Sequence, residues 1–229
     1  MVKFKNVTKK FGETTALAQV TFEIDPGEFV FIIGPSGAGK TTLSKLILKK
    51  FLPSEGIIEI GGVDLQKISK RKMPEYRRKL GVVFQDFKLI PDFTVFENVA
   101  LALRILGRKE VDIPLRVMEV LRLVGLENRA EFFPAQLAGG ELQRTCLARA
   151  VVGTPEIVIA DEPTGNLDLK TARQIVDLLK KINQEMGKTV IMATHNFEVV
   201  NLMKERVIEL DKGRLVSDQK KGKYHLSSK

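Results

Sequence analysis

The stretch EFVFIIGPSGAGKTTLSKL, residues 28–46, decides the fold of this chain. It opens with a continuous apolar run, passes through a glycine-rich turn, and ends with apolar residues at helical spacing. The turn fits the pattern of two glycines separated by four residues and followed by lysine and threonine, in the strand-to-helix context that phosphate binding requires. A chance glycine turn would rarely occur in this context. The stretch therefore predicts binding of a nucleoside triphosphate.

Each part of this loop has a physical role toward phosphate. Glycines let backbone N–H groups turn inward around phosphate oxygens, and the helix N-terminus adds a favourable dipole. We expect Lys40 to bridge the β and γ oxygens and Thr41 to offer its hydroxyl to Mg²⁺. The residues expected to hold the nucleotide here are Gly34, Ser36, Gly37, Ala38, Gly39, Lys40, Thr41 and Thr42.

A second stretch, IVIADE at residues 157–162, supplies two carboxylates. They follow a buried strand at its C-terminal end, where ligands of parallel sheets bind. Because successive strand residues point to opposite sides, we expect Asp161 to face Mg²⁺ and Glu162 to face the γ-phosphate and an attacking water. The alternative is a pair of surface acids, which is the minor interpretation beside a phosphate loop.

Other single positions carry weaker signals. Gln85 ends the strand-like GVVFQ and could reach Mg²⁺ or the water, although a lone glutamine is usually polar surface. His195 ends TVIMATH and should lie at the edge of the acidic pair if these strands are parallel neighbours. Asp168 is a good N-cap for a helix over 169–186, and Phe11 could be core or could stack on a base.

Residues 137–144 read LAGGELQR and raise a choice between two interpretations. They could be an ordinary helix start, with Gly139 and Gly140 opening a helix that runs toward Val152. They could also be half of a nucleotide site that a second copy of the chain completes.

The coarse pattern along the chain predicts an α/β fold with a mixed sheet. The first sixty-five residues alternate as in an antiparallel sheet, residues 94–152 are helical in pattern, and EIVIA, 169–186 and TVIMA form a βαβ unit. A hairpin is expected around Lys212 and Gly213. We therefore expect a core with an antiparallel β part over about 1–87 and 153–217, an inserted helical part over about 88–152, and a basic tail over about 218–229.

Composition bounds the possible functions. The chain has 229 residues, 44% of them apolar, and a net charge of +9 that is concentrated in residues 67–79 and 212–229. A general nucleic-acid surface would spread further and interleave aromatic residues, so we expect no nucleic-acid partner. The two basic segments are either solvated faces or lie near an anionic membrane surface or an acidic partner.

The sequence also carries signals of location. It has no run of about 18 uninterrupted apolar residues, and its first residues lack the apolar middle of a signal peptide. We expect a cytoplasmic protein. The single cysteine, Cys146, lies in an apolar helical pattern and is expected to be a small core residue without a chemical role.

With these pieces in order, nearly the whole chain resembles the ATPase subunits of ATP-binding cassette (ABC) transporters, which have the P-loop NTPase fold. The resemblance rests on the order of GPSGAGKT, Gln85, LAGGE, IVIADE, GNLD and His195. It implies ATP and Mg²⁺ as ligands, and a head-to-tail dimer with ATP between the phosphate loop of one copy and the signature of the other.

Carried over to this sequence, the resemblance implies a role for each residue. Phe11 would stack on adenine, Gln85 and His195 would contact the γ-phosphate, Glu162 would be the catalytic base, and Asp168 would line the dimer seam. The implied signature residues are Ala138, Gly139, Gly140 and Glu141, and the implied Mg²⁺ residues are Thr41, Gln85 and Asp161.

Within this family the chain is most similar to the members that act in bacterial cell division. Stretches such as FPAQLAGGELQR and VIMATHNFEVVNLMKERVIEL carry this likeness. It implies an integral membrane protein as partner and a peripheral location on the inner face of the cell membrane. ATPases of lipoprotein-release and macrolide exporters are the alternative. A soluble cassette ATPase acting on nucleic acid fits less well, and a small-molecule kinase leaves LAGGE and GNLD unexplained.

Two residues depart from the family pattern. Phe11 stands where tyrosine is usual, which should preserve stacking. Ala138 stands where the signature has serine, whose hydroxyl contacts the partner's γ-phosphate. Loss of one charge-assisted hydrogen bond costs about 1.5–3 kcal/mol, which predicts a dimer weakened roughly ten- to a hundredfold and a slow ATPase.

Overall fold

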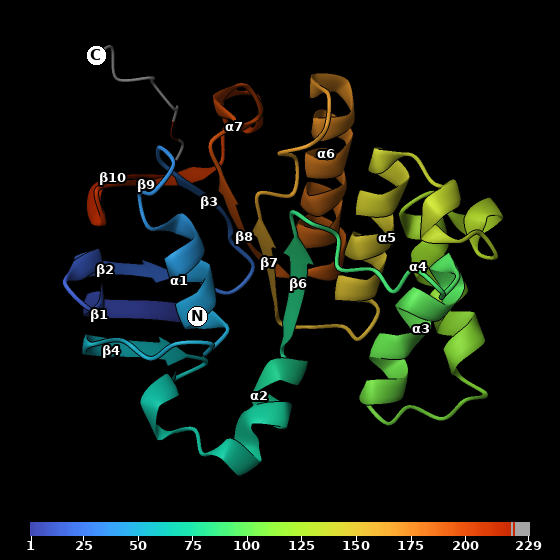
Figure 1. The fold of residues 1–229 in the computed structure, drawn as a ribbon, viewed down its shortest axis with the longest axis horizontal. Coiled ribbons are helices and arrows are strands. Elements are labelled where there is room, and N and C mark those ends of the chain that lie inside the picture. Colours follow the sequence, from blue (N-terminus) through green and yellow to red (C-terminus); the bar gives the residue numbers. More distant parts are fainter. Residues whose placement is uncertain (221, 223–229) are drawn as a thin grey trace.

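The computed structural model describes residues 1–220 and 222, and it consists of two sheets with helices between and beside them (Figure 1). Most of the predicted basic tail, with His225, lies outside the described residues. The strands of the first sheet are β1 (Val2–Phe11), β2 (Thr14–Ile24), β4 (Glu55–Ile60) and β5 (Val63–Asp64). The strands of the second sheet are β3 (Phe29–Ile33), β6 (Leu80–Phe84), β7 (Ile157–Asp161), β8 (Thr189–Thr194), β9 (Arg206–Asp211) and β10 (Arg214–Gln219).

The second sheet carries the central strands in the order β10-β9-β3-β8-β7-β6. Strands β9, β3, β8, β7 and β6 are all parallel, and β10 pairs antiparallel with β9. The predicted βαβ unit and the hairpin at Lys212 and Gly213 are therefore confirmed. Because the parallel strands end at one edge, the loops after β3, β6, β7 and β8 lie together there.

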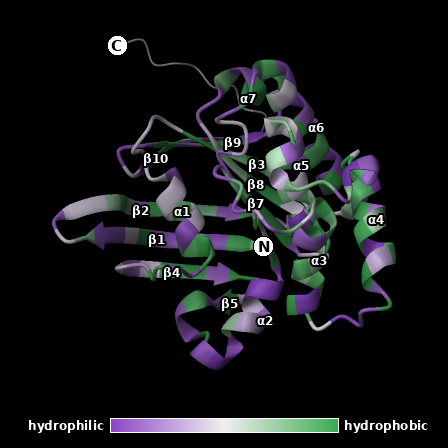
Figure 2. Ribbon diagram, turned by 45° about the vertical axis from the view of Figure 1, so that its right-hand side comes forward, coloured by the Kyte–Doolittle hydropathy of each residue, from purple (hydrophilic) through white to green (hydrophobic). Residues whose placement is uncertain are grey.

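Strand β3 is buried on both faces, which explains its continuous apolar sequence. Phe29, Phe31 and Ile33 belong to one hydrophobic core, whereas Val30 and Ile32 belong to the other. The same alternation holds for β7 and β8, and Figure 2 shows these strands as hydrophobic in the interior. The sheet thus needs a layer of structure on each side.

One face of this sheet is covered by α1 (Lys40–Ile47) and the antiparallel sheet. The antiparallel sheet has the order β2-β1-β4-β5, as the alternating pattern of the first residues predicts. Leu43, Leu46 and Ile47 of α1 pack in the same core as Val30 and Ile32 of β3. The helix after the phosphate loop is therefore fixed between two sheets.

The other face is covered by helices. Helices α5 (Gly139–Val151), α6 (Leu169–Met186) and α7 (Phe197–Met203) lie on this face, whereas α3 (Val95–Ile105) and α4 (Ile113–Leu123) pack against α5 beside the sheet (Figure 1). Helix α3 begins at a capping box in which Thr94 and Glu97 exchange hydrogen bonds. Between residues 88 and 152 the structure has helices and turns, in agreement with the helical pattern there. Within the described residues, no helix combines the length and apolar character needed to span a bilayer.

The basic segment at residues 67–79 forms two short 3₁₀ turns, Leu65–Lys67 and Lys70–Lys72, and the helix α2 (Met73–Arg78). All seven of its lysines and arginines are exposed. Tyr76 anchors α2, because its side chain is buried and its hydroxyl donates to the carbonyl of Ile47. The charges are therefore displayed on a fixed surface.

Cys146 is fully buried among apolar residues, as its sequence pattern predicts. Burial raises the pKa of its thiol to about 12, so the group stays protonated. Its Sγ donates a hydrogen bond to the carbonyl of Phe87, at 3.1 Å.

Contact between β6 and α5 requires glycine at position 81. A methyl group there would lie 2.4 Å from the carbonyl oxygen of Ala150, a rigid backbone atom. We expect Gly81→Ala to lower the free energy of unfolding by about 2 kcal/mol, because strand and helix must separate. Urea unfolding measures it. The control is Gly153→Ala, whose methyl would meet a movable methyl of Leu106 at 2.6 Å and should cost less than about 1 kcal/mol. Equal costs for the two variants would contradict this account.

Candidate functional site

The phosphate-type loop leaves β3 at Ile33 and enters α1 at Lys40. All three of its glycines have positive φ angles, +146° at Gly34, +80° at Gly37 and +104° at Gly39. A side chain at Gly34 would lie 2.1 Å from the carbonyl oxygen of Leu210, and one at Gly39 would lie 2.7 Å from that of Ala16. Both the conformation and the close approach of backbone exclude other residues at these positions.

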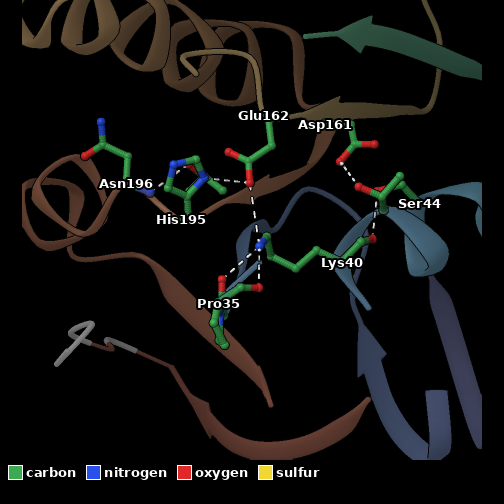
Figure 3. Close-up of polar contacts among 10 residues, drawn as sticks. Pro35, Lys40, Ser44, Asp161, Glu162, His195 and Asn196 are labelled. Atoms are coloured by element: carbon green, nitrogen blue, oxygen red, sulfur yellow. Dashed lines mark hydrogen bonds and ion pairs between the residues drawn. The ribbon is translucent and has the colours of Figure 1, made fainter. Parts of the chain in front are cut away.

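Lys40 lies under this loop with only 7% of its side chain exposed. Its Nζ donates to the carbonyl oxygens of Gly34, at 2.8 Å, and Pro35, at 3.1 Å. It also forms an ion pair with Glu162, with Nζ 3.6 Å from Oε1. Figure 3 shows these contacts as dashed lines. No side chain caps the N-terminus of α1. A buried ammonium and an uncapped helix start together suit an anionic oxygen group.

Asp161 is the last residue of β7 and faces α1. Its Oδ1 accepts a hydrogen bond from the Thr41 hydroxyl, at 3.3 Å. Burial raises the pKa of the Asp161 carboxyl; the bond from Thr41 opposes this rise, and the charge of Glu162 adds to it. Two of the three residues expected to hold Mg²⁺, Thr41 and Asp161, are thus in contact.

Glu162 lies between Lys40 and His195 (Figure 3). Its Oε1 is 3.0 Å from Nδ1 of His195, and its Oε2 is buried without a hydrogen-bond partner. Only 13% of the side chain is exposed. A buried carboxylate oxygen without a partner is costly, so this atom is placed for a donor that comes with a ligand or water.

The side chains of Asp161 and Glu162 point in different directions for another reason than the alternation along a strand that we expected. Strand β7 ends at Asp161, and Glu162 has a left-handed backbone with φ +50°. Its N–H donates to the carbonyl of Ala193, at 2.9 Å. The two carboxylates therefore diverge because the chain turns after the strand, and simple alternation along β7 does not account for it.

Gln85 and His195 both follow strands at this edge. His195 follows β8 directly, which pairs with β7 as predicted, and its side chain is 63% exposed. Gln85 is exposed and lies one residue beyond Phe84, the register partner of Asp161. Its Nε2 is 3.0 Å from where a methyl on Gly165 would stand. The structure therefore brings Gln85 next to the turn that follows Glu162.

The signature residues open α5, as predicted. Ala138 is the N-cap residue, and its N–H donates to Oε2 of Glu141, at 2.9 Å. The Ala138 N–H, followed by the Arg129 guanidinium at 3.0 Å, lowers the pKa of the Glu141 carboxyl. Position 140 faces Thr171, since a methyl on Gly140 would lie 2.6 Å from its Cγ2. The signature thus packs on the start of α6.

Asp168 caps α6 as its sequence position predicts. Its side chain accepts hydrogen bonds from the N–H and the hydroxyl of Thr171, at 3.0 and 2.6 Å. Phe11, at the end of β1, is 42% exposed and packs edge-on against Phe51, with Lys9 above its ring. Phe11 is therefore a surface aromatic at the end of its strand and does not belong to the core.

Some residues near the site carried no sequence signal for their contacts. Gly165 was part of the GNLD stretch but had no expected role beside Gln85. Arg149 lies in the apolar pattern of α5, and its guanidinium donates to the carbonyls of Phe87 and Lys88. These contacts join residues that are about sixty positions apart, and such a pairing cannot be read from local spacing.

The arrangement fits a magnesium–triphosphate. Within the described residues, no group of three or more His, Cys, Asp or Glu side chains could hold a metal ion by itself. A Mg²⁺ here would share one carboxylate and a hydroxyl with phosphate oxygens and water, which is the coordination this ion prefers. The uncapped start of α1 supplies N–H donors for the phosphate oxygens, and the unpaired Oε2 of Glu162 supplies an acceptor for a water molecule beside them.

Similarity to known proteins agrees with this geometry. Residues 17–165 match the family model described as ABC transporter. The chain is 50% identical over 225 residues to the cell division ATP-binding protein FtsE of Bacillus subtilis, over 98% of each protein. It is 44% identical over 216 residues to the FtsE of Escherichia coli K12, over 94% of this chain and 97% of that one.

Its structure is similar to a dimeric ATP-binding cassette in a post-hydrolysis state bound to ADP and Pi. The TM-score is 0.86 at 40% identity, over 98% of this chain and 100% of that one. The predicted fold class is confirmed.

The raised pKa of Asp161 predicts that the ionised carboxylate lowers the stability of the folded chain. Asp161 binds its proton more tightly in the folded chain than in the unfolded chain, so stability falls as the pH rises above the unfolded value of about 4. We expect Asp161→Asn to be more stable than the wild type at pH 7 without nucleotide, with the difference vanishing toward pH 3. Urea unfolding across this pH range measures it.

The control for this prediction is Glu141→Gln. Its carboxylate has a lowered pKa, so removal of the charge should destabilise the protein at pH 7, the opposite sign. A wild type as stable as Asp161→Asn at pH 7 would show that burial of this carboxylate carries no cost.

Proposed function

Because this chain belongs to the ABC transporter family of ATPases, we propose that it hydrolyses ATP as the cytoplasmic subunit of an FtsEX-like complex in cell division. The relatives named FtsE support the cell-division role. Within the site, the position of Glu162 carries the proposal. It is held by Lys40 and His195, and it keeps one buried oxygen free of partners.

Hydrolysis needs a base beside the γ-phosphate and a cationic side chain that binds the phosphate oxygens. Glu162 accepts a proton from the attacking water through its unpaired Oε2, and His195 holds the other oxygen of this carboxylate. Lys40 exchanges the carbonyls of Gly34 and Pro35 for the more strongly accepting phosphate oxygens. Phe11 stacks on the adenine, since it is a surface aromatic.

Magnesium would be held by Thr41, Asp161 and Gln85 together with phosphate oxygens. When bound, it neutralises the charge that develops on the transferred phosphoryl group. The contact between Thr41 and Asp161 supports this assignment, as does the position of Gln85 one residue beyond Phe84, the register partner of Asp161. The rest of the loop, from Gly34 to Thr42, would surround the phosphates with backbone N–H groups.

A second copy of the chain would complete the site. The signature, Ala138 to Glu141, contacts Arg129 and Thr171, which do not belong to the phosphate loop. In a head-to-tail dimer its helix N-terminus would face the ATP of the partner, with Asp168 at the seam. The dimeric form of a similar cassette supports this arrangement.

The membrane partner would be an FtsX-like integral protein. It would bind to the surface formed by the basic segment at residues 67–79, which we call the basic face. A groove of about 600 Å³ runs between α2 and the helical part, and Lys70, Arg77, Arg78 and Arg149 line it among apolar side chains. We assign residues 88–152 to a helical unit and residues 1–87 with 153–217 to the nucleotide-binding unit. The groove lies between these two units.

Substitution of the base tests hydrolysis and dimerisation together. Glu162→Gln should lose ATP hydrolysis by at least about 100-fold and retain ATP binding, because only proton acceptance is removed. With ATP it should dimerise weakly. Adding Ala138→Ser should tighten this dimer roughly ten- to a hundredfold through one restored hydrogen bond. Sedimentation with ATP and Mg²⁺ measures the association.

The control distinguishes an effect of the serine hydroxyl on dimerisation from an effect of the serine on the stability of α5. Ala138 is an N-cap residue, so serine would also stabilise α5, whereas glycine caps better than alanine without offering a hydroxyl. In the Glu162→Gln background, Ala138→Gly should leave the dimer unchanged. Equal association for all three variants would remove the role of Ala138, and unchanged hydrolysis by Glu162→Gln would refute the assignment of the base.

Charge reversal tests the basic face. In the described part of the chain, Lys79 alone among the seven basic residues of 67–79 forms an ion pair, with Glu156. We expect Arg77→Glu with Arg78→Glu to reduce membrane recruitment in cells several-fold, while ATP binding is unchanged. The control reverses Arg122 and Lys181, two exposed cations elsewhere. Equal membrane fractions for both double variants would contradict this assignment.

A further inference from the structure

Arg149 holds the backbone of the loop that carries Gln85. From α5 its Nη2 donates to the carbonyl of Phe87, at 2.7 Å, and its Nη1 donates to that of Lys88, at 2.5 Å. Cys146, one turn earlier on the same helix, donates to the same Phe87 carbonyl. Three donors from one helix therefore converge on two peptide groups, two and three residues after Gln85.

The backbone that they hold has an uncommon conformation. Phe87 and Lys88 have φ angles of 57° and 52°, so two consecutive residues that are not glycine are left-handed. Such residues persist only where the surroundings over-determine them. The fork of a guanidinium can donate to two successive carbonyls at once, which a lysine ammonium at this place could not reproduce. Burial lowers the pKa of Arg149, and the group remains charged at neutral pH.

The two sides of this turn belong to different parts of the molecule. Before it, Gln85 follows β6 of the central sheet and lies against Gly165, whose N–H donates to the carbonyl of Glu162, at 3.2 Å. After it, the chain is tied to α3, where Asn98 exchanges hydrogen bonds with the backbone of Ile90. The direction in which the chain leaves Gln85 is therefore set by the helical part.

We propose that Arg149 is the positioning residue for Gln85, and that it aligns this side chain with the magnesium and the attacking water. This inference rests on the proposed function. Arg149 also lines the groove between α2 and the helices. A partner bound in that groove would contact Arg149, the same side chain that holds the Gln85 loop. Binding of the partner and alignment of Gln85 would therefore both depend on Arg149.

A double-mutant cycle on the full chain tests the proposal. We expect Arg149→Met to lower kcat about tenfold and to raise the half-saturating Mg²⁺ concentration several-fold, with the Kd for ATP within about twofold. In the Gln85→Ala background, the same substitution should change kcat by less than about twofold, because Arg149 acts through Gln85. Arg149→Lys should give an intermediate kcat.

The control is Arg116→Met. Arg116, on α4, also donates to a backbone carbonyl, that of Val152 at 3.2 Å, and it does not touch the Gln85 loop. Its loss should leave kcat and the Mg²⁺ dependence unchanged. Amide hydrogen exchange without nucleotide gives a second readout. Residues 85–89 should exchange faster in Arg149→Met than in the wild type, and no faster in Arg116→Met.

The outcomes separate this proposal from the assigned function. Equal fold losses of kcat in the wild-type and Gln85→Ala backgrounds would overturn it, as would an unchanged kcat in Arg149→Met. If Arg149→Met does not fold, the same cycle with Arg149→Lys decides the matter. A wild type without ATPase activity would refute the proposed function, and the exchange rates of residues 85–89 would still show whether Arg149 holds the loop.

Discussion

Burial of β3 on both faces is the constraint on which the rest of this structure depends. A strand without a solvent face needs a layer on each side, and the chain provides α1 with an antiparallel sheet on one side and helices on the other. The close contacts of Gly34 with Leu210 and of Gly39 with Ala16 then leave the loop after β3 one path. That path brings Lys40 under the loop and beside Glu162.

The edge of the sheet where the strands end combines burial with charge. Asp161 is partly removed from water, and Glu162 has one oxygen with no partner. Both features oppose folding, since a desolvated carboxylate and an unpaired acceptor each raise the free energy of the folded state. A ligand that brings a divalent cation and polar groups relieves both. The ligand therefore binds more tightly, because its binding removes two unfavourable contributions to the free energy of the folded, ligand-free protein.

The helical part does more than carry the signature. It contacts the central sheet through Gly81 of β6, and it holds the Gln85 loop through Arg149 and Asn98. The signature packs on the start of α6. A movement of the helical part would therefore act on two things together: the alignment of Gln85 within one copy and the approach of the signature to the other.

The sequence by itself determined the elements whose signals are local. Apolar runs predicted β3, β7 and β8, the glycine spacing predicted the phosphate loop, and Asp168 marked the start of α6, because burial, turn chemistry and helix capping act over a few residues. Tertiary structure alone decided the left-handed turn at Glu162, the carbonyl partners of Lys40 and the hold of Arg149 on Phe87. These features depend on the packing of residues far apart in the chain, and local spacing contains no information about such contacts.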